Sequence, residues 1–187
     1  EVVAIVKEAN TNKTKVTIAG NGTGLTGARV PQNGIVIATD KLNRILEINP
    51  TEYYAVIEPA VLLSDFQKEL KQQNLFYPPD PTETNCYIGG TVATNASGAK
   101  TFKYGPTRDY VIGLQVVLPD GEAIDLERGK QKAIGYELSL TTQSGKNISL
   151  KIPDYTFPAI KNASGYFVKK DMDAIDLFIG SEGTLCI

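Results

Sequence analysis

A glycine-rich segment between two apolar runs constrains this chain more than any other feature of its sequence. Residues 20–27 read Gly-Asn-Gly-Thr-Gly-Leu-Thr-Gly and follow the run Lys15–Ala19, whose β-branched residues predict a buried strand. The glycines leave the backbone free to bend and allow another group to approach it closely. Successive backbone N–H groups in such a loop form a concave anion site, most suited to a phosphate. The alternative is a glycine-rich hairpin loop that binds nothing.

Residues 22–27 also match the G-x-G-x-x-G pattern of dinucleotide-binding Rossmann folds, but the surrounding sequence excludes that fold. The pattern requires a helix that begins directly behind the glycines and faces the pyrophosphate with its N-terminus. Here residues 28–34 contain Pro31 and an Asn-Gly turn, and Ile35–Ala38 is a further β-branched strand. The helical pattern of Glu1–Asn10 precedes the loop instead.

Composition and charge remove several classes of function. A chain of 187 residues forms one domain or two small subdomains, and its formal net charge of −2 argues against nucleic acid or anionic membrane as a main partner. No run is long enough for a transmembrane helix. Because the chain opens without methionine and inside a helical pattern, we interpret it as part of a longer protein.

The absence of histidine is equally restrictive. Histidine-based catalysis, histidine-ligated metals and histidine-linked flavin cannot arise from these residues. Cys86 and Cys186 have neither metal-binding nor redox-pair spacing, which predicts two ordinary thiols in a reducing compartment. We predict no metal ligand.

Apolar periodicity predicts a mixed α+β fold with subdomains over about residues 1–75 and 76–187. In the first subdomain we expect helices over 1–10 and 62–74, the latter capped by Ser64 or a neighbour, and strands over 15–19, 35–38, 45–48 and 54–59. In the second we expect strands over 110–118 and 123–126 around a tight turn, and short strands over 137–140 and 147–152. Residues 175–179 read as a buried strand or helix end, followed by a turn over 180–187 that runs into a strand.

Two further segments suggest the walls of a binding cleft. Residues 76–82 carry three prolines in four positions, which predicts a stiff, extended connection. This connection is either a linker between subdomains or a rigid rim for a flat ligand. Residues 88–98 are small and uncharged, so they can pack tightly or lie against a planar ring. After the glycine-rich loop, this stretch predicts the second wall of one cleft.

Together these segments resemble the FAD-linked oxidases and dehydrogenases related to the glycolate oxidase flavin subunit and bacterial D-lactate dehydrogenase. The motifs that carry the resemblance are Gly20–Gly27, Pro78–Pro81 with residues 88–98, Tyr104-Gly105 with Arg108-Asp109, and Lys161–Tyr166 with Gly180–Leu185. The resemblance implies an FAD-binding domain of the vanillyl-alcohol oxidase type, not a Rossmann fold. Such a domain has a small βαβ-like layer and a larger, mainly antiparallel sheet flanked by helices.

The resemblance also implies a non-covalent FAD site. The loop would bind the pyrophosphate, and residues 182–187 would cover the adenosine end or the ring edge. Residues 80–87, with Gly89 and Gly90, would line the flavin or its ribityl chain, and residues 94–97 would continue that wall. The candidate cofactor-binding residues are Gly20, Asn21, Gly22, Thr23, Gly24, Leu25, Thr26, Gly27, Asp80, Pro81, Thr82, Tyr87, Gly89, Gly90, Thr94, Asn95, Ala96, Ser97, Glu182, Gly183, Thr184 and Ile187. No catalytic residue is predicted.

In the resembling enzymes a 2-hydroxy acid gives a hydride to the flavin, and a C-terminal cap domain supplies the substrate arginine, the metal-ligating histidines and the base. We therefore predict the FAD-binding portion of an oxidoreductase for a 2-hydroxy acid of the glycolate or D-lactate type, inactive by itself because the cap domain is absent. The alternatives are a same-fold flavoenzyme with other chemistry, such as a cell-wall enolpyruvyl reductase or an ether-lipid synthase, and a flavin-free interaction module.

The expected partners are FAD, the 2-hydroxy acid through the cap domain, and an electron-acceptor or iron–sulfur protein. Nucleic acid is not among them. The expected location is the cytoplasm, with peripheral attachment to the inner membrane through partner proteins as the alternative.

Overall fold

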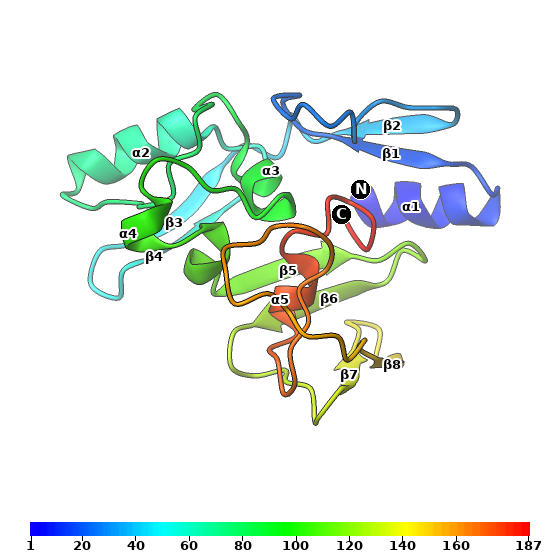
Figure 1. The fold of residues 1–187 in the computed structure, drawn as a ribbon. Helices are drawn as coiled ribbons and strands as arrows, with labels where there is room; N and C mark the ends of the chain where they lie inside the picture. The colour runs from blue at the N-terminus through cyan, green and yellow to red at the C-terminus, as the bar shows by residue number, and fades with distance from the viewer. The chain divides into compact units, whose positions relative to one another are not determined.

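The structure, a computed structural model, describes all residues from 1 to 187 and combines short helices with four two-stranded sheets (Figure 1). Internal contacts divide the chain into two units. We call Thr17–Asp109 the central unit, and Glu1–Val16 together with Tyr110–Ile187 the terminal unit. The Pro-rich segment over 76–82 lies inside the central unit. The subdomain boundary near residue 75 stays a prediction.

The strands of the central unit form two sheets. β1 (Val16–Ala19) pairs with β2 (Ile35–Ala38), and the glycine-rich segment belongs to their connection. β3 (Ile45–Asn49) pairs antiparallel with β4 (Tyr54–Ile57), with Ile48 opposite Ala55. No helix follows the glycines before β2, which confirms that the loop is not of the Rossmann type.

One long helix, α2 (Leu63–Gln72), packs on the β3–β4 hairpin, as Figure 1 shows. Its apolar residues recur at helical spacing, so they form one buried face. Leu63, Phe66 and Leu70 of this face form one cluster with Val61, Cys86 and Ile88. Residues of the hairpin that pack against the cluster are the partly buried Ile45, Ile48, Ala55 and Ile57. This cluster is the core of the central unit.

The predicted cap of this helix by Ser64 or a neighbour is wrong, because no side chain caps the helix. The N-cap is Leu62, which makes no side-chain cap hydrogen bond, and Ser64 lies inside the first turn. The free N–H groups at the helix start donate instead to distant main chain, from Leu63 to the Cys86 carbonyl (3.0 Å) and from Ser64 to the Thr84 carbonyl (3.1 Å). Tertiary contact therefore replaces the local cap.

The rest of the central unit consists of short helices joined by extended chain. The small-residue stretch begins with α3 (Ile88–Ala93), and α4 (Thr101–Tyr104) and a 3₁₀ turn over Thr107–Tyr110 follow. The sequence predicts neither of the last two, because four residues are too few to show a period.

The terminal unit combines α1 (Val2–Thr11) with two antiparallel hairpins. β5 (Gly113–Val117) pairs with β6 (Ala123–Glu127), and β7 (Glu137–Thr141) pairs with β8 (Asn147–Lys151). Leucines alternate with polar residues along β7, so one face is buried. The two hairpins confirm the predicted antiparallel strands, but each sheet has only two strands, not the larger sheet expected.

The chain ends with α5 (Ile175–Phe178), so a helix forms where the sequence left strand and helix open. After it, Ile187 exchanges two backbone hydrogen bonds with Val117, of 2.8 and 2.9 Å. The expected closing strand is thus reduced to one paired residue. None of the helices has both the length and the apolar character that crossing a membrane requires.

Candidate functional site

The glycine-rich loop leaves its backbone donors unused. None of the amide N–H groups from Asn21 to Gly27 donates a hydrogen bond within the chain. Leu25 is fully exposed, and a Cβ built on Gly24 would meet no atom within 4 Å. Gly22 and Gly27 adopt φ of +74° and +78°, a region that disfavours other residues. Open space beside unpaired amides is what an anion site requires.

The loop is tied to the segment that precedes α3. The Asn21 side-chain amide donates to the Asn85 carbonyl (2.5 Å), and a Cβ on Gly20 would lie 3.7 Å from the ring of Tyr87. The Tyr87 hydroxyl donates to Asp40 Oδ1 (2.9 Å). This hydrogen bond raises the pKa of Tyr87, because it favours the neutral phenol beside a carboxylate. The structure therefore brings the first group of candidate residues next to Tyr87.

The Pro-rich segment packs against the end of the small-residue stretch. A Cβ on Gly98 would overlap the Asp80 carbonyl and would lie 2.8 Å from the Pro81 nitrogen, so only glycine fits there. Lys100 forms an ion pair with Asp80 (3.0 Å), and its ammonium lies 5.3 Å from the centre of the Phe76 ring. The candidate residues Asp80 and Pro81 are thus held beside the residues that follow Thr94.

The candidate residues Thr94–Ser97 are fixed by main-chain contacts. Asn95 is buried with φ of +46°, and its Oδ1 accepts the Arg108 N–H (2.9 Å). The Thr107 hydroxyl donates to the Ala96 carbonyl (2.8 Å), and the Thr94 hydroxyl donates to the Gly90 carbonyl (2.9 Å). This wall is therefore rigid without any ligand.

The two glycines of α3 have different surroundings. A Cβ on Gly89 would lie 2.5 Å from Pro59 Cβ, so this glycine allows close packing. A Cβ on Gly90 would meet nothing within 4 Å, so this residue leaves open space. Of this predicted pair, Gly90 has the environment expected of a ligand contact, and the cofactor role of Gly89 stays a prediction.

The last group of candidate residues forms a turn within the terminal unit. Glu182 and Gly183 have positive φ, and the Thr184 hydroxyl donates to the Ser181 carbonyl (2.5 Å). The Tyr166 hydroxyl contacts Thr184 Oγ1 at 2.7 Å, which joins two of the sequence motifs. Burial raises the pKa of the neighbouring Cys186 thiol to about 11. The roles of Glu182, Gly183, Thr184 and Ile187 toward a cofactor stay predictions.

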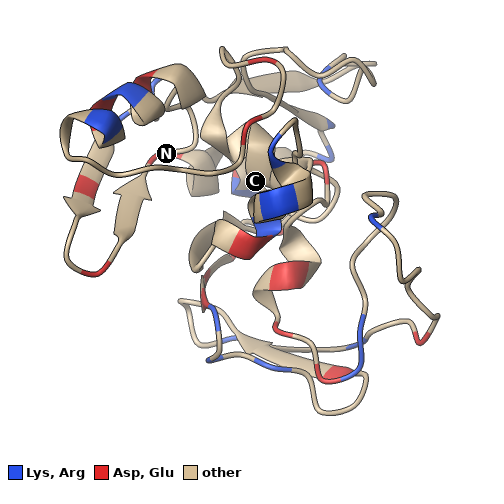
Figure 2. Cartoon of the chain, turned by 60° about the vertical axis from the view of Figure 1, so that its left-hand side comes forward, with Lys and Arg blue, Asp and Glu red and all other residues tan.

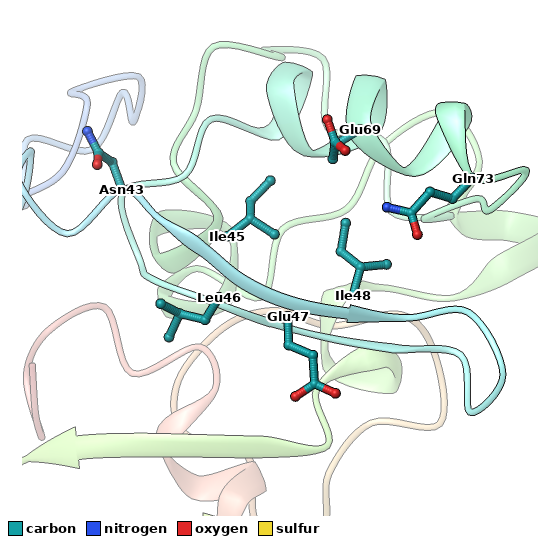
Figure 3. Close-up of a pocket in the computed structure, with 7 residues that line it drawn as sticks. All are labelled: Asn43, Ile45, Leu46, Glu47, Ile48, Glu69 and Gln73. Atoms are coloured by element: carbon teal, nitrogen blue, oxygen red, sulfur yellow. The ribbon is translucent and has the colours of Figure 1, made fainter.

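A separate hollow of the central unit contains none of the candidate residues. It has a volume of about 460 Å³ and is lined by Asn43, Ile45, Leu46, Glu47, Ile48, Glu69 and Gln73 (Figure 3). Ile45 and Ile48 point toward α2, whereas Leu46 and Glu47 point the other way. This hollow is part of the gap between hairpin and helix, not of the candidate site.

Comparison with known families assigns the cofactor. Residues 1–127 match the FAD binding domain family. The chain belongs to this family. The predicted family and FAD are thereby confirmed, and the loop described above fits the pyrophosphate of FAD, since it offers unpaired amides and room for close approach.

Curated relatives extend over nearly the whole chain. D-lactate dehydrogenase of Anaerostipes hadrus is 39% identical over 100% of this chain and 32% of that protein. D-2-hydroxyglutarate dehydrogenase of Stutzerimonas stutzeri is 34% identical over 99% of this chain and 33% of that protein. Glycolate oxidase subunit GlcD of Bacillus subtilis is 32% identical over 100% of this chain and 33% of that protein. The chain thus spans about a third of the length of these relatives.

Solved structures confirm the predicted fold. An alkyldihydroxyacetonephosphate synthase structure matches 100% of this chain and 30% of its own chain, with a TM-score of 0.66 and 22% identity. 6-Hydroxy-D-nicotine oxidase from Arthrobacter nicotinovorans matches 69% of this chain and 28% of its own, with a TM-score of 0.63 and 23% identity. At these identities the likeness shows the fold alone.

Proposed function

We propose that this chain is the FAD-binding portion of an oxidoreductase that oxidises a 2-hydroxy acid of the glycolate or D-lactate type. The observation that carries the proposal is the open loop over Gly20–Gly27, in which the amides of residues 21–27 have no acceptor within the chain. Family membership supports FAD as the ligand of that loop. The names of three relatives, which refer to D-lactate, D-2-hydroxyglutarate and glycolate, support the substrate class.

In this proposal the residues of the chain bind and orient FAD without a covalent link. The loop holds the pyrophosphate, Tyr87 and Gly90 lie along the ribityl chain, and the rigid wall Thr94–Ser97 lies along the flavin. Glu182–Ile187 cover the adenosine end or the ring edge. Bound FAD supplies the hydride acceptor, while the residues that bind the 2-hydroxy acid and remove its hydroxyl proton lie outside this chain.

Two further parts of the proposal concern the setting of the protein. We place it in the cytoplasm, because its two cysteines are both free thiols and such thiols persist in reducing compartments. The proposed protein partner is an electron acceptor or an iron–sulfur protein, which would take up the electrons that a bound flavin supplies. The 2-hydroxy acid reaches the flavin through the cap domain of the intact protein.

An absorbance spectrum after incubation with FAD and gel filtration tests this function. Flavin bands that co-elute with the protein are expected. Gly24→Val should abolish them, because its side chain enters the space proposed for the ligand, where a Cβ meets no protein atom within 4 Å. Gly113→Val is the matched control, since a Cβ at this exposed strand residue meets only ordinary contact at 3.6 Å.

Three outcomes would separate the alternatives. Flavin retained by Gly24→Val would remove the loop from the site. Flavin lost by both variants would indicate general damage instead of a blocked site. If the intact wild-type protein is colourless and takes up no FAD, the flavin-free interaction module replaces the oxidoreductase.

A further inference from the structure

A turn brings the side chain of Arg29 back over the glycine-rich loop. The Val30 N–H donates to the Gly27 carbonyl (2.9 Å), and Gly27 has φ of +78°. The Arg29 guanidinium lies so close to Gly22 that a Cβ there would overlap its Cζ and would lie 2.5 Å from Nε. Gly22 therefore does more than accept a positive φ, since its missing side chain is the space that the guanidinium occupies.

Arg29 has no partner within the chain. It forms no ion pair and donates no hydrogen bond, although its side chain is charged and exposed. Arg44, by contrast, pairs with Glu58 (2.7 Å), and Arg128 pairs with Asp176 (3.1 Å). Arg29 is thus an exposed cation without a partner that lies beside Gly22 in the predicted anion site.

The loop offers no other charge for this purpose. Arg29 is the only charged residue between Gly20 and Gly34. Along the rest of the chain acidic and basic residues are interspersed, as Figure 2 shows. Without Arg29, the loop would bind a doubly charged pyrophosphate through neutral amides alone, with no positive charge of its own.

We infer that Arg29 is a direct ligand of the FAD pyrophosphate, an inference that rests on the function proposed above. The planar guanidinium matches two phosphate oxygens with parallel N–H donors, and it stays charged at every relevant pH. The amides of residues 21–27 bind the remaining oxygens. Arg29 then contributes to the affinity for the diphosphate, and the flavin ring is bound by other residues.

Binding titrations of the intact protein test this inference. The variants are Arg29→Gln, Arg29→Lys and the matched control Lys68→Gln, which removes one exposed cation from α2 in the same unit. Dissociation constants are measured by calorimetry for FAD, for ADP, which carries the adenosine and the diphosphate without the flavin, and for riboflavin, which carries no phosphate. Thermal unfolding of each variant checks the fold, and exposed substitutions of this kind change stability by at most about 0.5 kcal/mol.

Arg29→Gln should weaken the binding of FAD and ADP about tenfold, because a charge-assisted pair of hydrogen bonds is lost. The affinity for riboflavin should not change. Arg29→Lys keeps the charge but not the two parallel N–H donors of the guanidinium. Its affinity for FAD and ADP should therefore lie between those of the wild type and Arg29→Gln. Lys68→Gln should bind as the wild type does. The affinity of the wild type should also fall more steeply with salt than that of Arg29→Gln, because salt screens the removed charge.

The ligands distinguish the ways in which the inference can fail. Equal FAD affinity of Arg29→Gln and wild type overturns it and leaves the proposed function intact. Equal losses for riboflavin and ADP also overturn it, since they indicate a deformed loop instead of a lost phosphate contact. A wild-type protein that binds none of the three ligands overturns the proposed function, and this inference with it.

Discussion

Substituting alanine for Gly98 should destabilise the protein, whereas the same substitution at Gly90 should not. At Gly98 the added Cβ overlaps the Asp80 carbonyl, which is main chain and cannot rotate away. Overpacking of this kind lowers the free energy of unfolding by about 1–3 kcal/mol. Because the obstacle at Gly98 is main chain, we expect a value near the upper end of this range. Displacement of residue 98 also strains the hydrogen bond from its N–H to Thr101 Oγ1 (2.7 Å), worth about 1 kcal/mol.

The expected loss for Gly98→Ala is therefore about 3 kcal/mol, or a decrease in Tm of about 6–12 °C for a chain of this size. Gly90 lies inside α3 with open space at its Cβ, so alanine should add about 0.5–1 kcal/mol of helix stability and raise Tm by about 2 °C. Thermal unfolding followed by circular dichroism measures both. If Gly98→Ala melts no lower than Gly90→Ala, the packing of the Pro-rich segment on Gly98 is refuted.

Two further predictions concern titratable groups of the terminal unit. Hydrogen bonds from Ser144 and Thr142 lower the pKa of Glu122, so its stabilisation is present at neutral pH and is lost as pH falls below about 4.5. As pH falls into the acid range, the Tm of Glu122→Gln should therefore decrease less steeply than the Tm of the wild type. The exposed control Glu8→Gln should follow the wild type. Burial raises the pKa of Cys186 from 9.0 to about 11. At pH 8 its thiolate fraction is therefore about a hundredfold lower than that of an exposed thiol. Alkylation of Cys186 followed by mass spectrometry should be correspondingly slow in the folded protein and fast in urea; equal rates would contradict its burial.

The sequence predicts those parts of the fold that depend on local pattern. The strands around the loop follow from β-branched runs, and α2 follows from apolar residues at helical spacing. The start of α2 could not be predicted in the same way, because its N–H groups donate to carbonyls some twenty positions further along the chain. Ser64 carries a favourable cap side chain, but the nearby main chain of residues 84–86 removes the need for it.

The candidate site shows the same limit at single residues. Gly89 and Gly90 are adjacent and identical in type, yet one packs on Pro59 and the other leaves open space. Arg29 reads as an ordinary surface arginine until the turn over residues 27–30 places its guanidinium at Gly22. A pattern in the sequence identifies the loop, whereas only the tertiary contacts show which of these residues have open space or an unpaired charge beside them.

The surroundings of the loop glycines favour binding over a structural role. Gly22 and Gly27 are explained by positive φ, but Gly24 has neither a positive φ nor a neighbour that would exclude a side chain. Relative to alanine, a glycine in an ordered segment costs about 0.5–1 kcal/mol in conformational entropy. Nothing within the chain offsets this cost at Gly24, which supports the proposal that a ligand approaches its backbone closely. The Gly24→Val variant therefore separates the FAD-binding loop from an empty hairpin more sharply than any substitution at the other glycines.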